Sequence, residues 1–511
     1  MVSTPENNKR IAQNTLLLYV RMLFMMIISL YTSRIVLNLL GVEDFGIYNV
    51  VGGVVAMFSV LSGSLSAAIS RFITYELGIG NKKKLKSIFS SAINIQLCIG
   101  VVIIILAETI GIWFLNTKMD IPTERMVAAN WVLQFSVATF VINLISVPYN
   151  AAIIAHEKMS AFAYISIIEV IGKLTIAYLI AISPIDKLIF YSMLIFIVAS
   201  IIRLAYGIYC KRNFEECTYH YIWDKNLLKQ MFVFSGWNFI GASATVLRDQ
   251  GGNIVINLFC GPTVNAARGI AFQVNTAIQG FVQNFMTALN PQITKSYASG
   301  NHEYTIMLIY KGARFSFYML LLLSLPVLVN TSFLLELWLK FVPQHTVLFV
   351  QLALIFTMSE SISGPLITTM LATGNIRNYQ IIVGGLNLMN LPLSYMLLKT
   401  GHSPETVFII AIIISQCCLL ARLYILRKMI KLSAIDYIKK VILNILIVTC
   451  LSAILPFAMK QIIRVTPVSF ILISIVCIFS TACIIYSVGC SRHERQYINT
   501  FIRKQLNKNG N

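Results

Sequence analysis

The apolar residues of this chain form long uninterrupted runs that alternate with short polar segments. Fourteen runs have roughly 20 residues or more, enough for each to cross a hydrocarbon core about 30 Å thick as a helix. Strands of a membrane barrel would be shorter and would alternate apolar with polar residues. The pattern therefore predicts an all-α polytopic membrane protein with about 14 transmembrane helices.

The predicted spans fall into groups along the chain. They cover about residues 12–40, 46–77, 88–115, 126–153, 160–182, 188–209, 230–259, 264–294, 307–329, 346–372, 379–398, 405–426, 441–459 and 468–489. A charged connector, 211–229, follows the sixth span. We predict an N-lobe at 1–215, a C-lobe at 216–430, two additional helices within 431–490 and a basic cytoplasmic tail at 491–511.

The first two groups of six spans carry matching turn residues. Gly41 and the pair Gly80-Asn81 recur as Gly261 and Gly300-Asn301, each at an offset of 220 residues. Pro148 recurs as Pro365, at an offset of 217. The chain is therefore predicted to contain two related lobes. Each proline either lets its helix kink as a gate or leaves a static bend.

Composition and charge support a membrane location. The chain is 57% hydrophobic and only 12% charged, with a mean hydropathy of +0.76, which excludes a soluble globular protein. Of the 40 Lys and Arg residues, 26 fall in even-numbered loops and at the termini, Arg422 among them, and 7 fall in odd-numbered loops. Since basic residues accumulate in cytoplasmic loops, both termini are predicted to be cytoplasmic. The net charge of +20 then reflects topology and requires no nucleic acid partner.

The ten cysteines and six histidines are scattered, with no metal-ligand spacing. The cysteines are best interpreted as small apolar residues. We therefore predict neither a metal site nor a cofactor.

The eighth predicted span carries a polar stripe. Its members recur at helical spacing on one narrow face. They are Asn265, Arg268, Asn275, Gln279, Gln283 and Asn290. A lipid-facing helix would not carry this stripe, so we predict that it lines a cavity, with Arg268 as its main binding residue.

Other charges within spans add to this picture, because each unpaired charge at mid-helix costs roughly 2.5 to 3.5 kcal/mol on the insertion scale. Arg21 in the first span and Arg248 in the seventh are further cavity candidates, although a membrane arginine can also reach a head group. Glu169, Asp249 and Glu360 are the acidic candidates for ion coupling. Glu169 can instead pair with Lys173 one turn away, and Asp249 adjoins Arg248.

Seven basic residues lie inside or at the edges of the predicted spans, against five acidic ones, so the cavity is predicted to be net positive and to suit an anionic substrate. Guanidinium groups bind phosphate oxygens through paired hydrogen bonds, and amides suit sugar hydroxyls. A phosphate-linked glycan meets both conditions. Repeated lobes are the usual apparatus of alternating access, so the sequence predicts a transporter.

At this point a family resemblance becomes visible. The turn Leu40-Gly41-Val42-Glu43-Asp44-Phe45-Gly46-Ile47-Tyr48, the stretch Ser70-Arg71-Phe72 and the fourteen-span plan resemble bacterial polysaccharide flippases of the multidrug/oligosaccharidyl-lipid/polysaccharide (MOP) exporter superfamily. The resemblance implies two pseudo-symmetric six-helix lobes in a V-shaped, MATE-like arrangement plus two C-terminal helices.

The resemblance also implies a function. Undecaprenyl-pyrophosphate-linked oligosaccharide units would pass from the inner to the outer leaflet of the bacterial inner membrane, for O-antigen (lipopolysaccharide), capsule or exopolysaccharide assembly. Cationic side chains would receive the pyrophosphate, and Arg21, Arg248 and Arg268 match by helix position. Membrane lipids, H⁺ or Na⁺, and polysaccharide polymerase machinery are the implied partners.

Two other functions compete with this prediction. A drug or organic-cation antiporter of the same fold would have an acidic, aromatic cavity, whereas basic residues are in excess here. A membrane glycan polymerase or acyltransferase would need an ordered outer loop or a His/Asp constellation, and the predicted outer loops are too short to hold one. We therefore predict a transporter that is not an enzyme.

Overall fold

The computed structural model describes residues 5–56, 59–119, 121–222, 224–339, 342–462, 466–492, 494–496 and 499–500. Within these ranges the regular elements are helices and no strand occurs. Along the described residues, ten helices are long and apolar enough to cross a membrane, or eleven if one bent pair is a single span. The all-α polytopic fold is therefore confirmed. The predicted second, seventh and eighth spans are helical along their described residues but are not among these ten or eleven.

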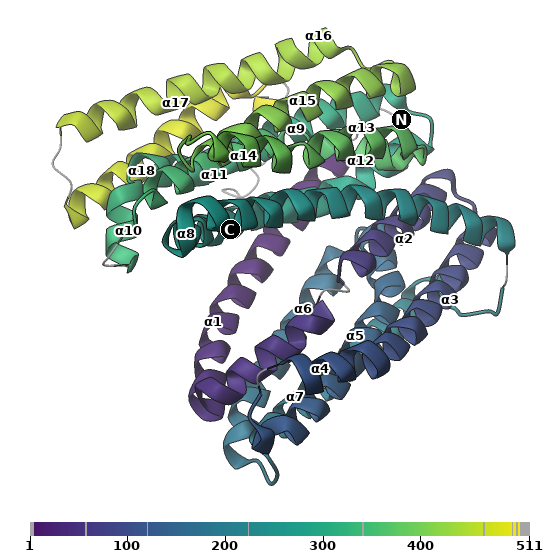
Figure 1. Ribbon diagram of the computed structural model, residues 1–511. Helices are drawn as coiled ribbons and strands as arrows, with labels where there is room; N and C mark the ends of the chain where they lie inside the picture. Colours follow the sequence, from purple (N-terminus) through teal and green to yellow (C-terminus); the bar gives the residue numbers. More distant parts are fainter. Residues whose placement is uncertain are drawn as a thin grey trace, which may run out of the picture. The chain divides into compact units, whose positions relative to one another are not determined.

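One compact unit comprises Ile11–Phe239. Its elements are α1 (Pro5–Ala56), α2 (Ser59–Ile79), α3 (Lys82–Leu106), the π-helix η1 (Ala107–Gly111), α4 (Ile112–Lys118), the 3₁₀ turn η2 (Thr123–Arg125), α5 (Met126–Ala155), α6 (Met159–Leu179), η3 (Ile180–Ile182), α7 (Lys187–Asn213), η4 (Glu215–Cys217) and the first part of α8 (Lys225–Ala298). Helix α5 packs against α2, α3, α6 and α7 and is the centre of this unit (Figure 1).

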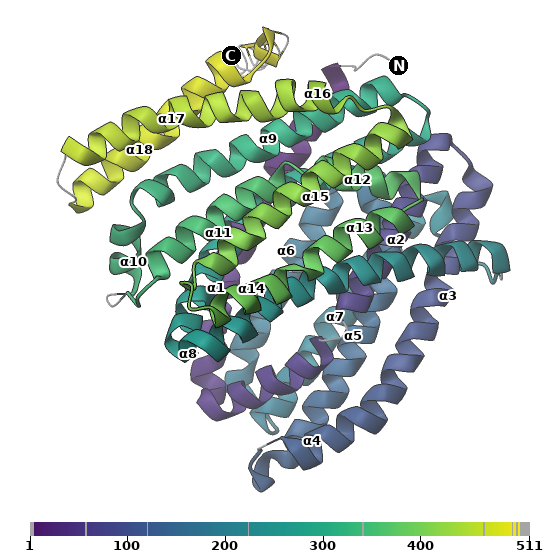
Figure 2. The same ribbon diagram turned by 45° about the horizontal axis from the view of Figure 1, so that its top comes forward.

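The other unit comprises the described residues of Met1–Arg10 and Ile240–Asn511. After α8 it contains α9 (His302–Val329), α10 (Thr331–Leu339), α11 (Thr346–Ser361), α12 (Gly364–Thr373), α13 (Arg377–Leu388), α14 (Asn390–Lys399), α15 (Thr406–Ile430), α16 (Ala434–Tyr437), η5 (Ile438–Ile442), α17 (Leu443–Ile462), α18 (Pro467–Ile484) and η6 (Ile485–Gly489). Figure 2 shows α17 and α18 as a hairpin beside α9. The two units divide within α8, whereas the predicted lobes meet at 215/216.

The repeat inferred from the sequence is visible in the backbone. Gly41 interrupts α1 at φ 84° and ψ 168°, and Gly261 interrupts α8 at φ 82° and ψ 175°. This region of backbone space is essentially open to glycine alone. Gly80 and Gly300 also share a positive φ, of 83° and 75°. The first pair of equivalent glycines therefore matches in both φ and ψ, and the second pair matches in φ.

The asparagines after the second pair of glycines also act alike. The Asn81 side chain accepts a hydrogen bond from the Lys84 backbone amide at 3.1 Å and caps α3. Asn301 accepts from the Tyr304 amide at the same distance and caps α9. Each side chain satisfies a backbone donor that the first turn of a helix leaves open. The 220-residue repeat thus extends to helix capping.

The predicted tenth span is broken in the structure. Helices α11 and α12 meet at an angle of 41°. Pro365 lies in the first turn of α12, where its missing N–H costs nothing, while Pro148 lies inside the unbroken helix α5. The hydroxyl of buried Tyr437 donates to the Ile362 carbonyl at the break, at 2.9 Å. The second copy therefore breaks its helix beside the proline, where the Tyr437 hydroxyl satisfies a backbone carbonyl, while α5 of the first copy is continuous.

Another repeated feature is a contact between a basic side chain and a carboxylate, which the sequence analysis did not single out. Arg125 contacts Asp44 and Asp186 at 2.6 Å each. In the other unit, His345 contacts Glu405 at 2.5 Å. Residues 125 and 345 are 220 apart, and 186 and 405 are 219 apart. Each unit therefore links the residue before one helix, α5 or α11, to the residue before another, α7 or α15.

The contact between His345 and Glu405 is expected to make the stability of the fold depend on pH. Burial acts to raise the pKa of Glu405, but hydrogen bonds from His345 and the backbone outweigh it and hold that pKa below its ordinary value. A carboxylate with a lowered folded-state pKa stabilises the fold above its unfolded pKa of about 4.3, and this contribution disappears as pH falls through the folded value. Glu405→Gln is expected to lower the thermal unfolding midpoint by about 1–2 °C at pH 7.

Thermal unfolding at several pH values checks this expectation. The difference between wild type and Glu405→Gln should shrink as pH falls below about 4.3. Glu336→Gln is the matched control, because Glu336 is exposed on nearby α10 and changes the charge equally. A difference that stays constant from pH 7 to pH 3.5 would show that the carboxylate's charge is not what stabilises this contact.

Candidate functional site

The main sequence candidate, Arg268, is buried in the second half of α8. Its side chain is 4% exposed, and its Nη2 donates to the Asp249 carbonyl oxygen at 3.1 Å. The guanidinium lies 5.1 Å from the ring centroid of Phe272 and 5.2 Å from that of Phe408. Among the described residues, Nε has no hydrogen-bond partner. Since a guanidinium has five N–H donors, Arg268 retains capacity to bind an anion.

A second guanidinium and one carboxylate lie beside Arg268. The Arg248 Nε contacts the Asp249 Oδ1 at 2.9 Å, and Nη1 donates to the Asn387 Oδ1 at 3.3 Å. The Arg248 guanidinium also lies 5.0 Å from the ring centroid of Phe356. We refer to Arg248, Asp249 and Arg268 as the arginine cluster. Its two guanidiniums and single carboxylate leave it net positive.

A glycine makes room for the arginine cluster. A Cβ atom at Gly252 would lie 2.6 Å from the Arg268 Nη2, 2.8 Å from Nη1 and 2.9 Å from Cζ. Contacts this short would force the planar guanidinium to move. Gly252 lies in the polar stretch that follows Arg248 in the sequence. Because Gly252 has no side chain, the Arg268 guanidinium can lie against its backbone.

Two asparagines of the polar stripe hold the broken span. The Asn275 Oδ1 accepts a hydrogen bond from the Thr357 hydroxyl on α11 at 2.5 Å. The Asn290 Oδ1 accepts from the Thr368 hydroxyl on α12 at 2.7 Å. One bond lies on each side of the α11–α12 break. These two amides therefore attach α8 to both halves of the bent helix pair.

The remaining amides of the stripe differ in exposure. Asn265 and Gln279 are half-buried and Gln283 is exposed. Among the described residues, the buried Asn265 Oδ1 has no hydrogen-bond partner. The stripe thus combines two amides that form hydrogen bonds within the protein, Asn275 and Asn290, with amides that are at least partly accessible.

The acidic candidate Glu360 has a cationic neighbour that the sequence did not indicate. Its Oε1 accepts from the Ser415 hydroxyl at 2.5 Å, and it interacts electrostatically with Arg422. Arg422 is 3% exposed and donates to the Ser363 hydroxyl at 2.9 Å. Arg422 was counted with the inner-loop cations, but it is buried in α15. The seven-residue spacing from Ser415, two helical turns, is the signal that would have placed both on one face.

In the unit Ile11–Phe239, Arg21 and Glu169 lie near each other. The Arg21 guanidinium is 4.4 Å from the ring centroid of Phe162 and interacts electrostatically with Tyr206 and Glu169. Glu169 also forms the predicted ion pair with Lys173, at 2.6 Å. The buried Nε of Arg21 has no hydrogen-bond partner in the described part of the chain. Arg21 therefore resembles Arg268 in having an aromatic neighbour and an open donor.

The structure therefore brings the predicted residues together in two places. Arg248, Asp249 and Arg268 form one cluster, and Arg21 with Glu169 forms the other, each within its own compact unit. The described residues contain no group of three or more His, Cys, Asp or Glu that could hold a metal ion. These clusters offer guanidiniums beside aromatic rings, of which Arg268 is buried and Arg21 and Arg248 are half-buried.

A comparison with protein families shows which family this chain belongs to. The family described as polysaccharide biosynthesis protein matches residues 11–297, more than half of the chain. The chain belongs to this family. The expected resemblance to polysaccharide flippases of the MOP superfamily is thereby confirmed.

A similar curated protein is the uncharacterized membrane protein EpsK of Bacillus subtilis (strain 168). It is 19% identical over 301 residues, which cover 58% of this chain. The match spans 59% of that relative's length. This member of the polysaccharide biosynthesis family thus has a distant bacterial relative in the membrane.

Solved structures show the same fold. An outward-facing multidrug resistance MATE-family transporter of the MOP superfamily has a TM-score of 0.71 at 13% identity. A MOP-superfamily transporter from Pyrococcus furiosus has a TM-score of 0.70 at 14% identity. Each alignment covers 83% of this chain and 96% of the other. The chain is therefore a multi-pass membrane protein of the polysaccharide biosynthesis family, and its fold is that of the MATE and MOP-superfamily transporters.

Proposed function

We propose that this protein flips undecaprenyl-pyrophosphate-linked oligosaccharide repeat units from the inner to the outer leaflet of the cytoplasmic membrane, by alternating access, for O-antigen (lipopolysaccharide), capsule or exopolysaccharide assembly. The observation that carries the proposal is Arg268. It is a buried guanidinium with open donor capacity, next to a second arginine and inside a polysaccharide biosynthesis protein. A diphosphate is the group that such a cluster binds best.

The proposed roles follow from the contacts. Arg268 and Arg248 bind pyrophosphate oxygens, with Asp249 holding the Arg248 guanidinium in place at 2.9 Å. Gln279 and Gln283, which remain accessible, bind sugar hydroxyls. Asn275 keeps α8 attached to α11 through Thr357. Within the unit Ile11–Phe239, Arg21 is the proposed phosphate-binding guanidinium, because it has an aromatic neighbour and an open Nε donor among the described residues.

Ion coupling is assigned to the carboxylates. Each candidate already has a cationic neighbour: Lys173 for Glu169, Arg248 for Asp249 and Arg422 for Glu360. Binding of H⁺ or Na⁺ at such a carboxylate releases the neighbouring cation from its partner. Glu360 is the leading candidate because it lies one turn or less from the α11–α12 break, where its neighbour Arg422 donates to the Ser363 hydroxyl.

The proposal also covers the division of the chain into lobes and the orientation of the protein in the membrane. The N-lobe is placed at 1–215, the C-lobe at 216–430, the additional helices at 431–490 and the cytoplasmic tail at 491–511, most of which lies outside the described residues. Both termini face the cytoplasm of a bacterium, and the protein works beside membrane lipids and polysaccharide polymerase machinery. The counts of Lys and Arg in alternate loops support this orientation.

The test is ligand stabilisation of the purified protein in nanodiscs. A ligand that binds only the folded state at 100 times its dissociation constant adds about 2.7 kcal/mol to stability. Undecaprenyl pyrophosphate is expected to raise the unfolding midpoint, and uncharged undecaprenol and tetraphenylphosphonium are not. Stabilisation by tetraphenylphosphonium alone would overturn the proposal in favour of an organic-cation antiporter.

A transport assay completes the test. Proteoliposomes loaded with a short lipid-linked oligosaccharide should move it between leaflets faster than liposomes without protein. Movement of a neutral glycolipid at the same rate would show that the pyrophosphate is not recognised.

A further inference from the structure

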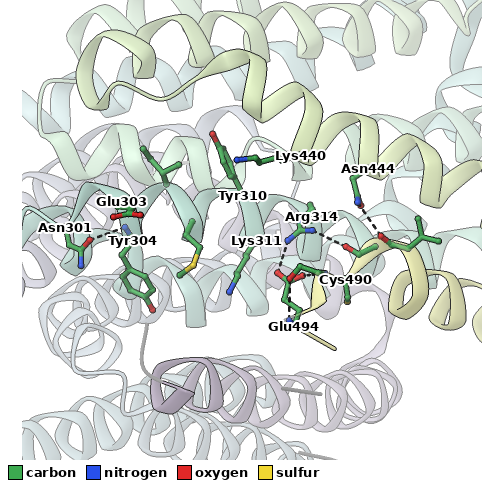
Figure 3. Close-up of a pocket in the computed structure, with 15 residues that line it drawn as sticks. Asn301, Glu303, Tyr304, Tyr310, Lys311, Arg314, Lys440, Asn444, Cys490 and Glu494 are labelled. Carbon is green, nitrogen blue, oxygen red and sulfur yellow. Dashed lines mark hydrogen bonds and ion pairs between the residues drawn. The ribbon is translucent and has the colours of Figure 1, made fainter. Parts of the chain in front are cut away.

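A pocket of about 870 Å³ lies at one end of α9, away from the arginine cluster. It is bounded by α9, the π-helix η5 at the start of α17, and the segment around η6 that follows α18 (Figure 3). The pocket begins at the Gly300-Asn301 turn, which the predicted topology places on the cytoplasmic side. None of the residues proposed for transport lines it.

Three cations line this pocket. Figure 3 shows Lys311 and Arg314 from α9 and Lys440 from η5. Arg314 is already bound, to the Gly489 carbonyl at 3.0 Å and to Glu494 at 2.7 Å. Among the described residues, Lys311 and Lys440 form no ion pair or hydrogen bond, and Lys440 lies 5.8 Å from the Tyr310 ring centroid. The two lysines therefore keep their donors for a ligand.

The carboxylates of the pocket do not cancel these lysines. Glu494 accepts from Arg314 and from the Ser491 backbone amide at 2.7 Å, so its oxygens are occupied. Glu303 is exposed in the first turn of α9. The pocket thus holds three cations and two carboxylates, and is net positive.

Both C-terminal helices change geometry where they meet the pocket. Residues Ile438–Ile442 and Ile485–Gly489 are π-helical, and Lys440 and Gly489 lie within these segments. Such segments are rare and occur often at functional sites. Here η5 carries Lys440 to the pocket, and η6 carries the Gly489 carbonyl that fixes Arg314. Two independent deviations from α-helix therefore shape one site.

The other walls suit the boundary of a membrane. Ile306, Met307 and Val488 line the pocket beside its charged groups. On the adjoining surface, Ile438 and Leu443 are exposed apolar residues, 43% and 51% accessible. A ligand with a charged end and an apolar end matches this arrangement. Basic pockets between transmembrane helices on the cytoplasmic side bind anionic head groups.

We propose that this pocket binds the phosphate of an anionic phospholipid head group through Lys311 and Lys440, with the acyl chains along the apolar surface of η5 and α17. The site ties α9 to the C-terminal hairpin, because the lysines come from both. It does not rest on the proposed transport function, since its residues and its ligand are separate.

The test measures lipid binding to detergent-purified protein by native mass spectrometry, with thermal unfolding as a second readout. Phosphatidylglycerol, phosphatidylcholine and inorganic phosphate are the three probes. Wild type is expected to retain phosphatidylglycerol and to gain stability from it. Lys311→Ala/Lys440→Ala should lose about 30-fold in apparent affinity, because each of the two basic residues near the surface contributes to anionic lipid binding.

Matched variants distinguish binding in this pocket from a general attraction of the lipid to the positive surface. Lys439→Ala/Arg427→Ala removes two exposed cations outside the pocket and should bind phosphatidylglycerol as wild type does. Lys311→Arg/Lys440→Arg should also retain binding. Equal loss in the control, or equal binding of phosphatidylcholine, would overturn the proposal. Stabilisation by inorganic phosphate as large as that by the lipid would assign the site to a free phosphate and overturn the lipid assignment.

Discussion

Arg268→Ala is expected to weaken undecaprenyl pyrophosphate binding by about 10- to 100-fold, because hydrogen bonds to charged groups contribute about 1.5–3 kcal/mol each. Arg268 is 4% exposed, and among the described residues its guanidinium donates to one backbone carbonyl, so little folding energy depends on that bond. A charge buried at mid-helix is itself unfavourable in the membrane. The protein should therefore fold and lose ligand affinity. Thermal-shift titration with undecaprenyl pyrophosphate measures both.

Three further variants identify which property of Arg268 matters. Arg268→Lys keeps the charge but not the fork of donors, so it should recover only part of the affinity. Arg268→Met keeps the length without the charge and should behave as alanine does. Gly252→Ala should also weaken binding, because its Cβ would lie 2.6 Å from the Arg268 Nη2.

Arg427→Ala is the control for the Arg268 variants, since it removes an exposed arginine from α15. It should bind like wild type. Normal affinity and transport in a folded Arg268→Ala protein would remove Arg268 from the proposed site, and the family assignment would stand without it.

Gly261→Ala is expected to lower the stability of the fold by about 1–3 kcal/mol, the strain of placing a side chain in this backbone region. Gly261 has φ 82° and ψ 175° where α8 turns, and a Cβ there would meet nothing within 4 Å. The whole cost would therefore come from the backbone, not from a clash. Gly41→Ala should behave in the same way, because Gly41 has the matching conformation. Thermal unfolding of the purified variants measures the effect.

Gly269→Ala and Gly46→Ala are the matched controls for the turn glycines. Both lie in regular helix, and a Cβ at either would also meet nothing within 4 Å. Since alanine favours helix over glycine, each should leave stability unchanged or raise it by about 0.5–1 kcal/mol. If Gly261→Ala and Gly269→Ala had equal stability, the turn conformation could not be what requires glycine.

The helix content and the repeat were predictable because they depend on local chemistry. Long apolar runs have few alternatives to helices in a membrane, since every backbone polar group must be satisfied internally. Gly41 and Gly261 have a backbone conformation that essentially only glycine adopts, so glycine is required at both positions. The repeat was therefore visible in the sequence as two glycines 220 residues apart.

The candidate site was predictable only in part. The sequence placed Arg268 on a polar face, but the partners of that face come from helices far along the chain: Phe408 on α15, Thr357 on α11 and Thr368 on α12. Asn275 and Asn290 looked like cavity amides and are bonded to those threonines. Glu360 lacked a nearby cation in the sequence and has Arg422, more than 60 residues later, as its neighbour.

By itself the sequence determined that the chain is an all-α membrane protein with two related halves, because hydropathy, helical period and glycine conformation act over a few residues at a time. Only the tertiary structure decided which charges are compensated, where the tenth span breaks, and that Lys311 and Lys440 share a pocket. Those features depend on contacts between helices that are far apart in the sequence, and no periodic pattern in the sequence indicates which helices meet. Electrostatic and hydrogen-bonding partners are chosen by packing, so they appear only once the helices are assembled.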